Sequence, residues 1–500
     1  MPQPTKTYSD FMNEISPSEL YEGLLAYGLF AEQLPPIFSA KSFFDYCQVI
    51  NPSFPNKPAG YIYYESIRNT NVPRILGIPN PTAYKRLCEC IANYWDKIQK
   101  HFIDSTINHS YIVSRVFIRK IKNEKKLFEM NYNNWRTYGT PELELLIGAR
   151  FLVKADISTC FPSIYTHALS WALVGKNIAK MNYRKNNEWY NILDRCTTHI
   201  NNQETQGLLI GPHTSNLLSE IILTKIDEKL YKDGWRYVRA IDDYTCYVDT
   251  YEKGQSFIIE LNEQLHYFGL SLNHKKTSID ALPIASEEQW IHRINTFSAF
   301  ISSNYLNYKN IKAYLNMIIE LMEKNDNNSA ILKYAIKVIA GKCLSKNARN
   351  HYVMTILHLT IIYPYLITQL EDFIFKPFSV DLNTIMNFSQ KLLEEGKKTC
   401  NYEEASYALY FATKYNFELP NVDLNFTIIS NNCVFLLMNY LYHKKHNMKN
   451  EIDLLKTHAL TLMQTEMDAY WLFIYEVLPQ NKLKDYWKNM KENKISFISI

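Results

Sequence analysis

The uneven distribution of glycine constrains the fold of this chain more than any other feature of its sequence. Of 14 glycines, 12 lie before residue 300, and only Gly341 and Gly396 follow it. Glycine interrupts regular helices, so the later part of the chain can be helical over most of its length. Apolar residues recur there at helical spacing, as in residues 405–415, 434–442 and 452–463. We therefore expect the chain to divide near residue 300.

The two parts are expected to differ in architecture. Residues 301–500 predict an all-α domain of antiparallel helix pairs; no strict period is visible, so a regular solenoid stays open. Residues 1–300 mix helix-like and strand-like segments after a proline-rich start, which predicts an α+β domain. With 47% hydrophobic and 21% charged residues, the composition is that of an ordinary globular protein.

Charge and cysteine content restrict the partners and the compartment. The net charge of +4, from 54 basic and 50 acidic residues, permits a nucleic-acid partner without requiring one. The nine scattered cysteines include no CxxC pair, which favours a reduced, cytoplasmic compartment. No membrane partner is expected. The N-terminus lacks the apolar core of a secretory signal, and the strongest apolar run, residues 352–368, is interrupted by polar residues and Pro364.

The segment YVRAIDDYTCYVD, residues 237–249, predicts a β-hairpin with paired carboxylates at its tip. Tyr237, Val238 and the residues after Tyr244 favour extended backbone, whereas Asp242 and Asp243 suit a tight turn. Two adjacent carboxylates repel each other, and a bound divalent cation would compensate for this repulsion. An isolated Asp-Asp turn is more often ordinary turn chemistry, so the prediction needs a further acidic residue.

Asp156 supplies that residue. It ends a short apolar strand that begins at Phe151, and a charge at the end of a buried strand requires compensation. If this strand lies beside the hairpin, Asp156 and Asp242 converge on one site. Such an oxygen-rich site suits Mg²⁺, with Mn²⁺ as an alternative, and supports in-line phosphoryl transfer.

Two further segments fit a site that handles nucleotides. Gly207 and Gly211 precede a predicted helix that Thr214 or Ser215 would cap, and its positive end near Gly211 suits an incoming nucleotide. In LNHKKT, Lys276 follows a short strand, where its charge would neutralise or protonate the leaving pyrophosphate. A solvated surface lysine is the alternative for this position.

The order of these parts resembles motifs A, B, C and D of reverse transcriptases. The phrases IYTHALSWALVGK, SNLLSEIIL and RILGIPNPTAY are similar to the abortive-infection (Abi) reverse transcriptases of the AbiK-like group, which are prophage-encoded and act in phage defence. The resemblance implies right-hand fingers and palm in residues 1–300 and a HEAT-like helical-repeat domain in residues 301–500. It also implies assembly into a homo-oligomer.

The same resemblance implies roles for individual residues. Asp156 and Asp242 would bind the metal together with the backbone carbonyl of Ile157, and Asp243 would support them. Phe161 resembles the steric gate that favours dNTPs over ribonucleotides, although by residue type alone a core residue is the better interpretation. Arg74 resembles the fingers arginine that binds the triphosphate.

The chain departs from the usual reverse-transcriptase pattern at Ala240, where an aromatic residue is common, and at Ile210, where glutamine is common. Those residues help to seat primer and template. The Abi group makes untemplated DNA primed by a tyrosine of the protein itself, so the expected product is single-stranded DNA attached covalently to this chain. Tyr8 is the candidate primer, because its N-terminal segment is polar and is expected to be mobile.

Three functions are therefore compared. The favoured one is Mg²⁺-dependent, protein-primed synthesis of DNA from dNTPs in antiphage defence. The second is a conventional RNA-templated reverse transcriptase. The third is a helical-repeat scaffold that binds nucleic acid and carries a vestigial site.

Overall fold

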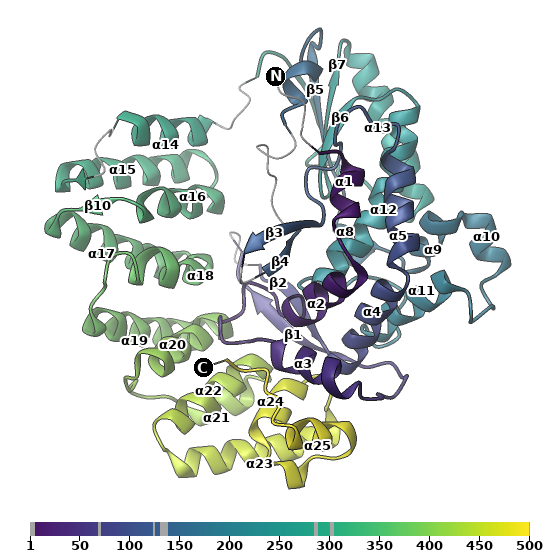
Figure 1. Cartoon of the computed structure of the whole chain (residues 1–500). Helices are drawn as coiled ribbons and strands as arrows, with labels where there is room; N and C mark the ends of the chain where they lie inside the picture. Colours follow the sequence, from purple (N-terminus) through teal and green to yellow (C-terminus); the bar gives the residue numbers. More distant parts are fainter. Residues whose placement is uncertain are drawn as a thin grey trace.

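The computed structural model describes residues 6–68, 72–123, 126–130, 139–284, 289–300 and 305–499. The first part of the chain mixes helices and sheets, and the part from residue 289 onward is helical apart from two strands of two residues each (Figure 1). Among the described residues, no helix is both long and apolar enough to span a bilayer.

A four-stranded antiparallel sheet forms the centre of the first part. Its spatial order is β6-β7-β5-β8, and its strands are β5 (Phe151–Asp156), β6 (Tyr237–Ala240), β7 (Asp243–Val248) and β8 (Ser278–Ala281). Helices α12 (His213–Lys232) and α13 (Tyr251–Tyr267) lie beside this sheet (Figure 1). The predicted strand ending at Asp156 therefore lies next to the predicted hairpin, as expected.

Helix α12 begins differently from the prediction. Pro212 occupies the N-cap position and provides no side-chain cap, while Thr214 and Ser215 lie buried in the first turn. The expectation that one of these hydroxyls caps the helix is wrong. Proline sets the backbone angle at which the helix starts. The side chains of Thr214 and Ser215 are buried by the close packing around α12.

Two hairpins and several helices complete the first part. The hairpins pair β1 (Tyr61–Ser66) with β2 (Arg74–Pro79), and β3 (Arg119–Asn123) with β4 (Lys126–Glu129). The helices that precede β3 are α1 (Tyr8–Asn13), α2 (Pro17–Tyr27), α3 (Lys41–Ile50), α4 (Pro81–Asn93) and α5 (Trp95–Thr106). Those that follow β4 are α7 (Glu142–Leu145), α8 (Cys160–Ser163), α9 (His167–Val174), α10 (Lys176–Met181) and α11 (Trp189–His199).

The second part stacks helices along the chain. Its first members are α14 (Gln289–Phe300), α15 (Tyr308–Lys324), α16 (Ser329–Ala340), α17 (Lys346–Ile362), α18 (Ile367–Leu370), α19 (Leu382–Thr399) and α20 (Tyr402–Tyr415). The last are α21 (Leu424–Ile429), α22 (Cys433–Lys445), α23 (Lys449–Thr465), α24 (Trp471–Val477) and α25 (Asp485–Glu492). The short parallel pair β9 (Tyr305–Leu306) and β10 (Cys343–Leu344) corrects the all-α expectation.

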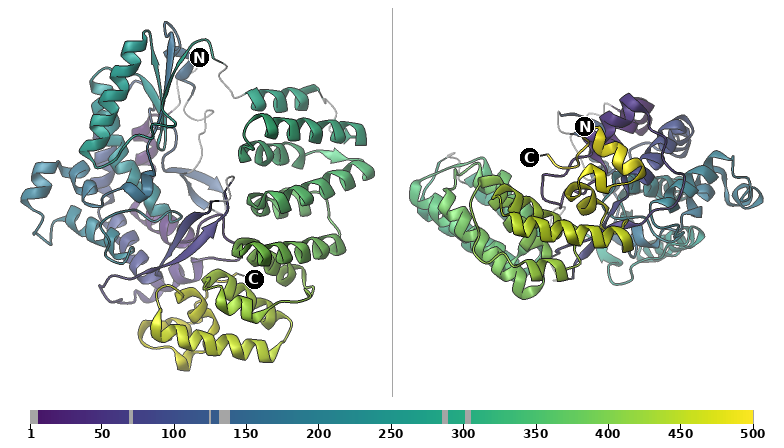
Figure 2. Two further views of the ribbon diagram at one scale, coloured as in Figure 1. Left: turned by 180° about the vertical axis from the view of Figure 1, so that it is seen from behind. Right: turned by 90° about the horizontal axis from the view of Figure 1, so that it is seen from below.

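The helical part curves around the first part. The column α14–α20 runs alongside it, and α22–α25 lie beneath α3 and the β1–β2 hairpin (Figures 1 and 2). Trp471 of α24 donates its indole N–H to the Ile78 carbonyl at 3.4 Å. Buried apolar residues form one continuous cluster that includes members of both parts, so the two parts share a core.

Candidate active site

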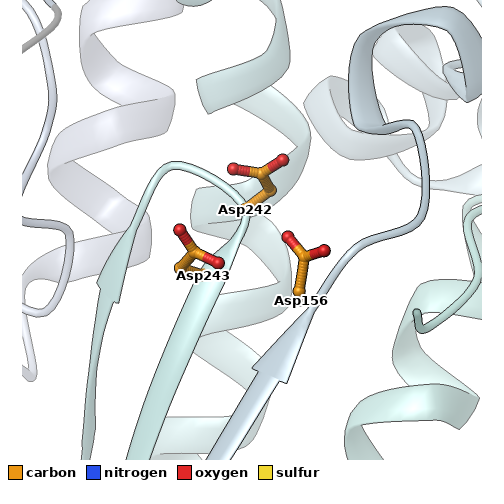
Figure 3. A group of neighbouring side chains, drawn as sticks. All are labelled: Asp156, Asp242 and Asp243. Atoms are coloured by element: carbon orange, nitrogen blue, oxygen red, sulfur yellow. The ribbon is translucent and has the colours of Figure 1, made fainter. Parts of the chain in front are cut away.

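Three carboxylates meet at one end of the central sheet. Asp156 is the last residue of β5, Asp242 lies in the turn between β6 and β7, and Asp243 is the first residue of β7. Asp156 and Asp243 are direct cross-strand partners. Each of the three side chains offers an oxygen that lies within 4.8 Å of the others (Figure 3). The predicted convergence of Asp156 and Asp242 is confirmed as geometry.

The backbone holds this arrangement in place. The amide of Ile157 donates to the carbonyl of Asp242 at 3.2 Å, which joins the end of β5 to the turn. The amide of Asn273 donates to the carbonyl of Asp156 at 2.7 Å. Ile157 is therefore joined to the turn through its amide, and the role of its carbonyl as a metal ligand stays a prediction.

The electrostatics favour a bound cation. Burial and the charge of Asp156 raise the pKa of Asp242. Burial, followed by the charges of Asp242 and Asp156, raises the pKa of Asp243 to about 6. The three carboxylates differ in burial, from the buried Asp156 to the exposed Asp243, and their negative charges repel one another. Hard oxygen ligands of this kind fit a divalent metal ion, so the three residues could hold one.

The side chain of Lys276 brings a positive charge next to these carboxylates. Its Nζ lies 3.0 Å from Asp156 Oδ2, and the amide Nδ2 of Asn273 donates to the same oxygen at 3.0 Å. The hydrogen bond between Lys276 and Asp156 raises the pKa of Lys276. Asn273 was not predicted as a site residue; the available signal was its position three residues before Lys276 in LNHKKT.

Phe161, Gly211 and Arg74 lie in three different segments: α8, the loop before α12, and the start of β2. Phe161, half-buried in α8, accepts a hydrogen bond from the amide of Leu208 at 2.8 Å through its carbonyl, which ties α8 to the loop before α12. Gly211 has φ +124° and packs against Ala31 and the carbonyl of Gly77, a conformation that requires glycine. Arg74 is exposed at the start of β2, and no ion pair joins it to the three carboxylates within the described residues.

The environment predicted for Tyr8 is wrong. Tyr8 belongs to α1 and is buried, and its hydroxyl donates to Glu220 Oε1 at 3.2 Å. Its ring packs on Phe117, with centroids 4.6 Å apart. Apolar side chains on one face of α1 draw the segment into the core, although its other residues are polar. The polar, mobile segment expected from the sequence is an anchored helix.

Arg239, a fully buried charge in β6, was not predicted as a site residue. Its guanidinium binds two carboxylates of α12, Glu220 and Asp227. The available signal was a basic residue between Val238 and Ala240 in a strand that is otherwise apolar. Glu220 and Asp227, seven residues apart, lie on one face of α12.

Comparisons with solved structures find weak similarities to telomerases. An apo telomerase from Candida tropicalis truncated from its C-terminal domain is 14% identical, with coverage of 49% of this chain and 54% of that chain and a TM-score of 0.28. Telomerase from Candida albicans in complex with a TWJ fragment of telomeric RNA is 10% identical, with coverage of 80% and 64% and a TM-score of 0.31. This chain thus spans about half of the first of these structures. TM-scores this low do not establish a shared fold.

A comparison with curated proteins found no match. The family model described as Reverse transcriptase (RNA-dependent DNA polymerase) matches residues 83–339, a span that contains β5, α12 and the β6–β7 hairpin. Because this match covers more than half of the 500 residues, the chain belongs to the reverse transcriptase family and is a nucleotidyltransferase.

Proposed function

We propose that this protein is an Mg²⁺-dependent DNA polymerase of the AbiK-like abortive-infection group, which builds untemplated DNA on one of its own tyrosines during antiphage defence. The observation that carries the polymerase proposal is the meeting of Asp156, Asp242 and Asp243 within 4.8 Å. Ala240 and Ile210, which replace residues that usually seat primer and template, support untemplated synthesis.

The proposed roles follow the geometry around the carboxylates. Asp156 and Asp242 would bind Mg²⁺ with the carbonyl of Ile157, and Asp243 would add negative charge beside them. The metal would lower the pKa of the attacking hydroxyl and hold the triphosphate. Lys276, which already pairs with Asp156, would shift toward the leaving pyrophosphate when the metal neutralises that carboxylate.

Three other residues would bind the nucleotide. Phe161 would stand against the ribose 2′ position and select dNTPs. The α12 end near Gly211 would face the phosphates, because the positive end of the helix dipole favours anions. Arg74, exposed at the start of β2, would bind the triphosphate through its guanidinium.

Tyr8 is a primer candidate for a new reason. Its hydroxyl binds Glu220, Glu220 binds Arg239, and Arg239 binds the carbonyl of Ile241, one residue before Asp242. Withdrawal of the short helix α1 from this pocket would move the Tyr8 hydroxyl past the tip of the β6–β7 hairpin. In that reaction the Tyr8 oxygen attacks the α-phosphorus of a dNTP, a phosphodiester forms, and pyrophosphate leaves.

We further propose a division into a fingers and palm domain over residues 1–300 and a HEAT-like repeat domain over residues 301–500, in a cytoplasmic homo-oligomer. The second candidate function is RNA-templated reverse transcription, which the description of the matched family favours.

One experiment separates these functions. Purified protein is incubated with each labelled dNTP and Mg²⁺, with and without added RNA, and is then digested with protease and nuclease. Label on a tyrosine peptide without RNA supports protein priming, and mass spectrometry identifies the residue. Strict dependence on RNA, with a product that matches its sequence, supports the second function. DNA binding without incorporation in Mg²⁺ or Mn²⁺ contradicts both.

A further inference from the structure

Arg239 is at the centre of a buried polar network behind the carboxylate site. Its Nη2 lies 2.6 Å from Asp227 Oδ2, and its Nη1 lies 3.1 Å from Glu220 Oε2. The hydroxyl of Tyr237 donates to Asp227 at 2.8 Å, and that of Tyr8 donates to Glu220. A planar guanidinium suits such paired carboxylates, and their two charges fix its orientation.

The same guanidinium reaches the hairpin turn. Arg239 Nη1 donates to the carbonyl of Ile241 at 2.9 Å. Ile241 has φ +60°, a left-handed conformation that is rarely adopted by a β-branched residue. On the other side of the turn, the carbonyl of Asp242 accepts the bond from Ile157. The turn is thus held from both sides in a conformation that isoleucine disfavours.

We infer that Arg239 is a positioning residue: oriented by Glu220 and Asp227, it holds the Ile241 carbonyl and thereby keeps the carboxylate of Asp242 beside that of Asp156. This inference rests on the proposed role of Asp156 and Asp242 as metal ligands. An ion network that only joined β6 to α12 would not need the bond to Ile241. That bond separates the positioning role from a purely structural one.

Arg239→Lys tests the inference with its charge retained. A lysine has no planar fork, so it cannot bind both carboxylates and the Ile241 carbonyl at the same time. The matched control is Arg119→Lys. Arg119 is another buried arginine, and its guanidinium pairs with Glu129 across the β3–β4 hairpin at 3.0 Å.

Two measurements on the full-length chain report on the turn. The first is hydrogen exchange of peptides that cover residues 237–248, which is measured without metal. The second is Mn²⁺ binding, which is measured by electron paramagnetic resonance without nucleotide. Because a left-handed isoleucine is disfavoured roughly tenfold, Arg239→Lys is expected to weaken Mn²⁺ binding by about tenfold and to speed exchange at the hairpin. Arg119→Lys should leave both close to wild type.

A second substitution tests the mechanism. Glycine adopts positive φ freely, so adding Ile241→Gly to Arg239→Lys should restore most of the lost Mn²⁺ affinity. Wild-type exchange at the hairpin in a folded Arg239→Lys variant would overturn the inference, as would the absence of rescue. If the wild-type chain binds Mn²⁺ no better than Asp156→Asn does, the proposed metal site fails, whereas hydrogen exchange still decides the role of Arg239.

Discussion

At the scale of single residues, the site depends on one buried carboxylate facing two others. Asp156 is only 6% exposed, yet it lies directly across the sheet from Asp243. Lys276 and Asn273 bind one oxygen of Asp156, Oδ2. A charge buried in this way is tolerated because it has these partners, and a metal ion would be a stronger one.

Replacing these carboxylates tests their chemistry. Asp156→Asn and Asp242→Asn are each expected to lower dNTP incorporation by a factor of about a hundred or more, because amides bind divalent cations poorly. Asp249→Asn is the matched control: Asp249 follows the far end of β7 and pairs with Lys253 in solvent. Incorporation of labelled dNTP in Mg²⁺ measures all three. Loss of activity in Asp249→Asn alone would contradict the assignment.

Phe161 tests nucleotide selection. Its ring is half-buried, and its backbone is held by the bond from Leu208. If the ring excludes a 2′-hydroxyl, Phe161→Ala should raise incorporation of ribonucleotides relative to dNTPs by about tenfold or more, since the clash is the source of selection. Phe161→Tyr retains the ring and should retain the preference. Equal preference in wild type and Phe161→Ala would identify Phe161 as a core residue.

At the scale of elements, helix α20 contacts the β1–β2 hairpin through a buried carboxylate. Glu403 of α20 accepts hydrogen bonds from the amide of Ile67 at 2.7 Å and from the hydroxyls of Ser66 and Tyr64. Its carboxyl is buried, and this burial raises its pKa to about 7 although the three donors oppose the shift. The contact between the two parts is therefore sensitive to pH.

The sign of this effect follows from proton binding. Between the ordinary value of 4.5 and about 7, the folded state holds a proton on Glu403 that the unfolded state has lost. The contribution of Glu403 to the free energy of unfolding is complete below pH 4.5 and is lost as the pH rises to about 7. The total loss is up to about 3 kcal/mol.

The urea midpoint of unfolding is expected to fall between about pH 5 and about pH 8, and to fall less in Glu403→Gln, whose side chain does not titrate. Glu394→Gln, on the exposed surface of α19, should retain the wild-type pH dependence. An unchanged dependence in Glu403→Gln would contradict the raised pKa.

At the scale of the whole molecule, the helical part supports the first part of the chain. The amide of Ser39 donates to the carbonyl of Phe497 at 2.9 Å, and the ring of Phe497 packs on Phe43. The carboxylate of Asp468 accepts from the amide of Gly60 at 3.0 Å. The end of the chain thus packs against segments near its start.

A fragment of residues 1–300 is expected to lose stability, because removal of α20, α22 and α24 uncovers apolar surface of the β1–β2 hairpin. The fragment should bind a hydrophobic dye and aggregate, and co-expression with residues 301–500 should restore a compact complex. Light scattering and dye fluorescence measure both states. A monomeric, dye-free fragment would show that the first part folds independently.

Several elements could be predicted because their signals are local. The helices at 405–415, 434–442 and 452–463 fall within α20, α22 and α23, since apolar spacing reports a helix wherever it packs. The hairpin at residues 237–248 follows from its turn residues. Tyr8 could not be placed, because its partner Glu220 is 212 residues away and nothing local indicates this contact.

The sequence by itself determined the β6–β7 hairpin, the strand that ends at Asp156 and several helices after residue 300, because backbone preference and side-chain periodicity act over a few residues. Only the tertiary structure decided which charges share a space. Antiparallel pairing set Asp156 opposite Asp243, and the packing of α12 against β6 placed Glu220 and Asp227 on Arg239. Burial strengthens such interactions, and burial depends on contacts between segments far apart in the chain.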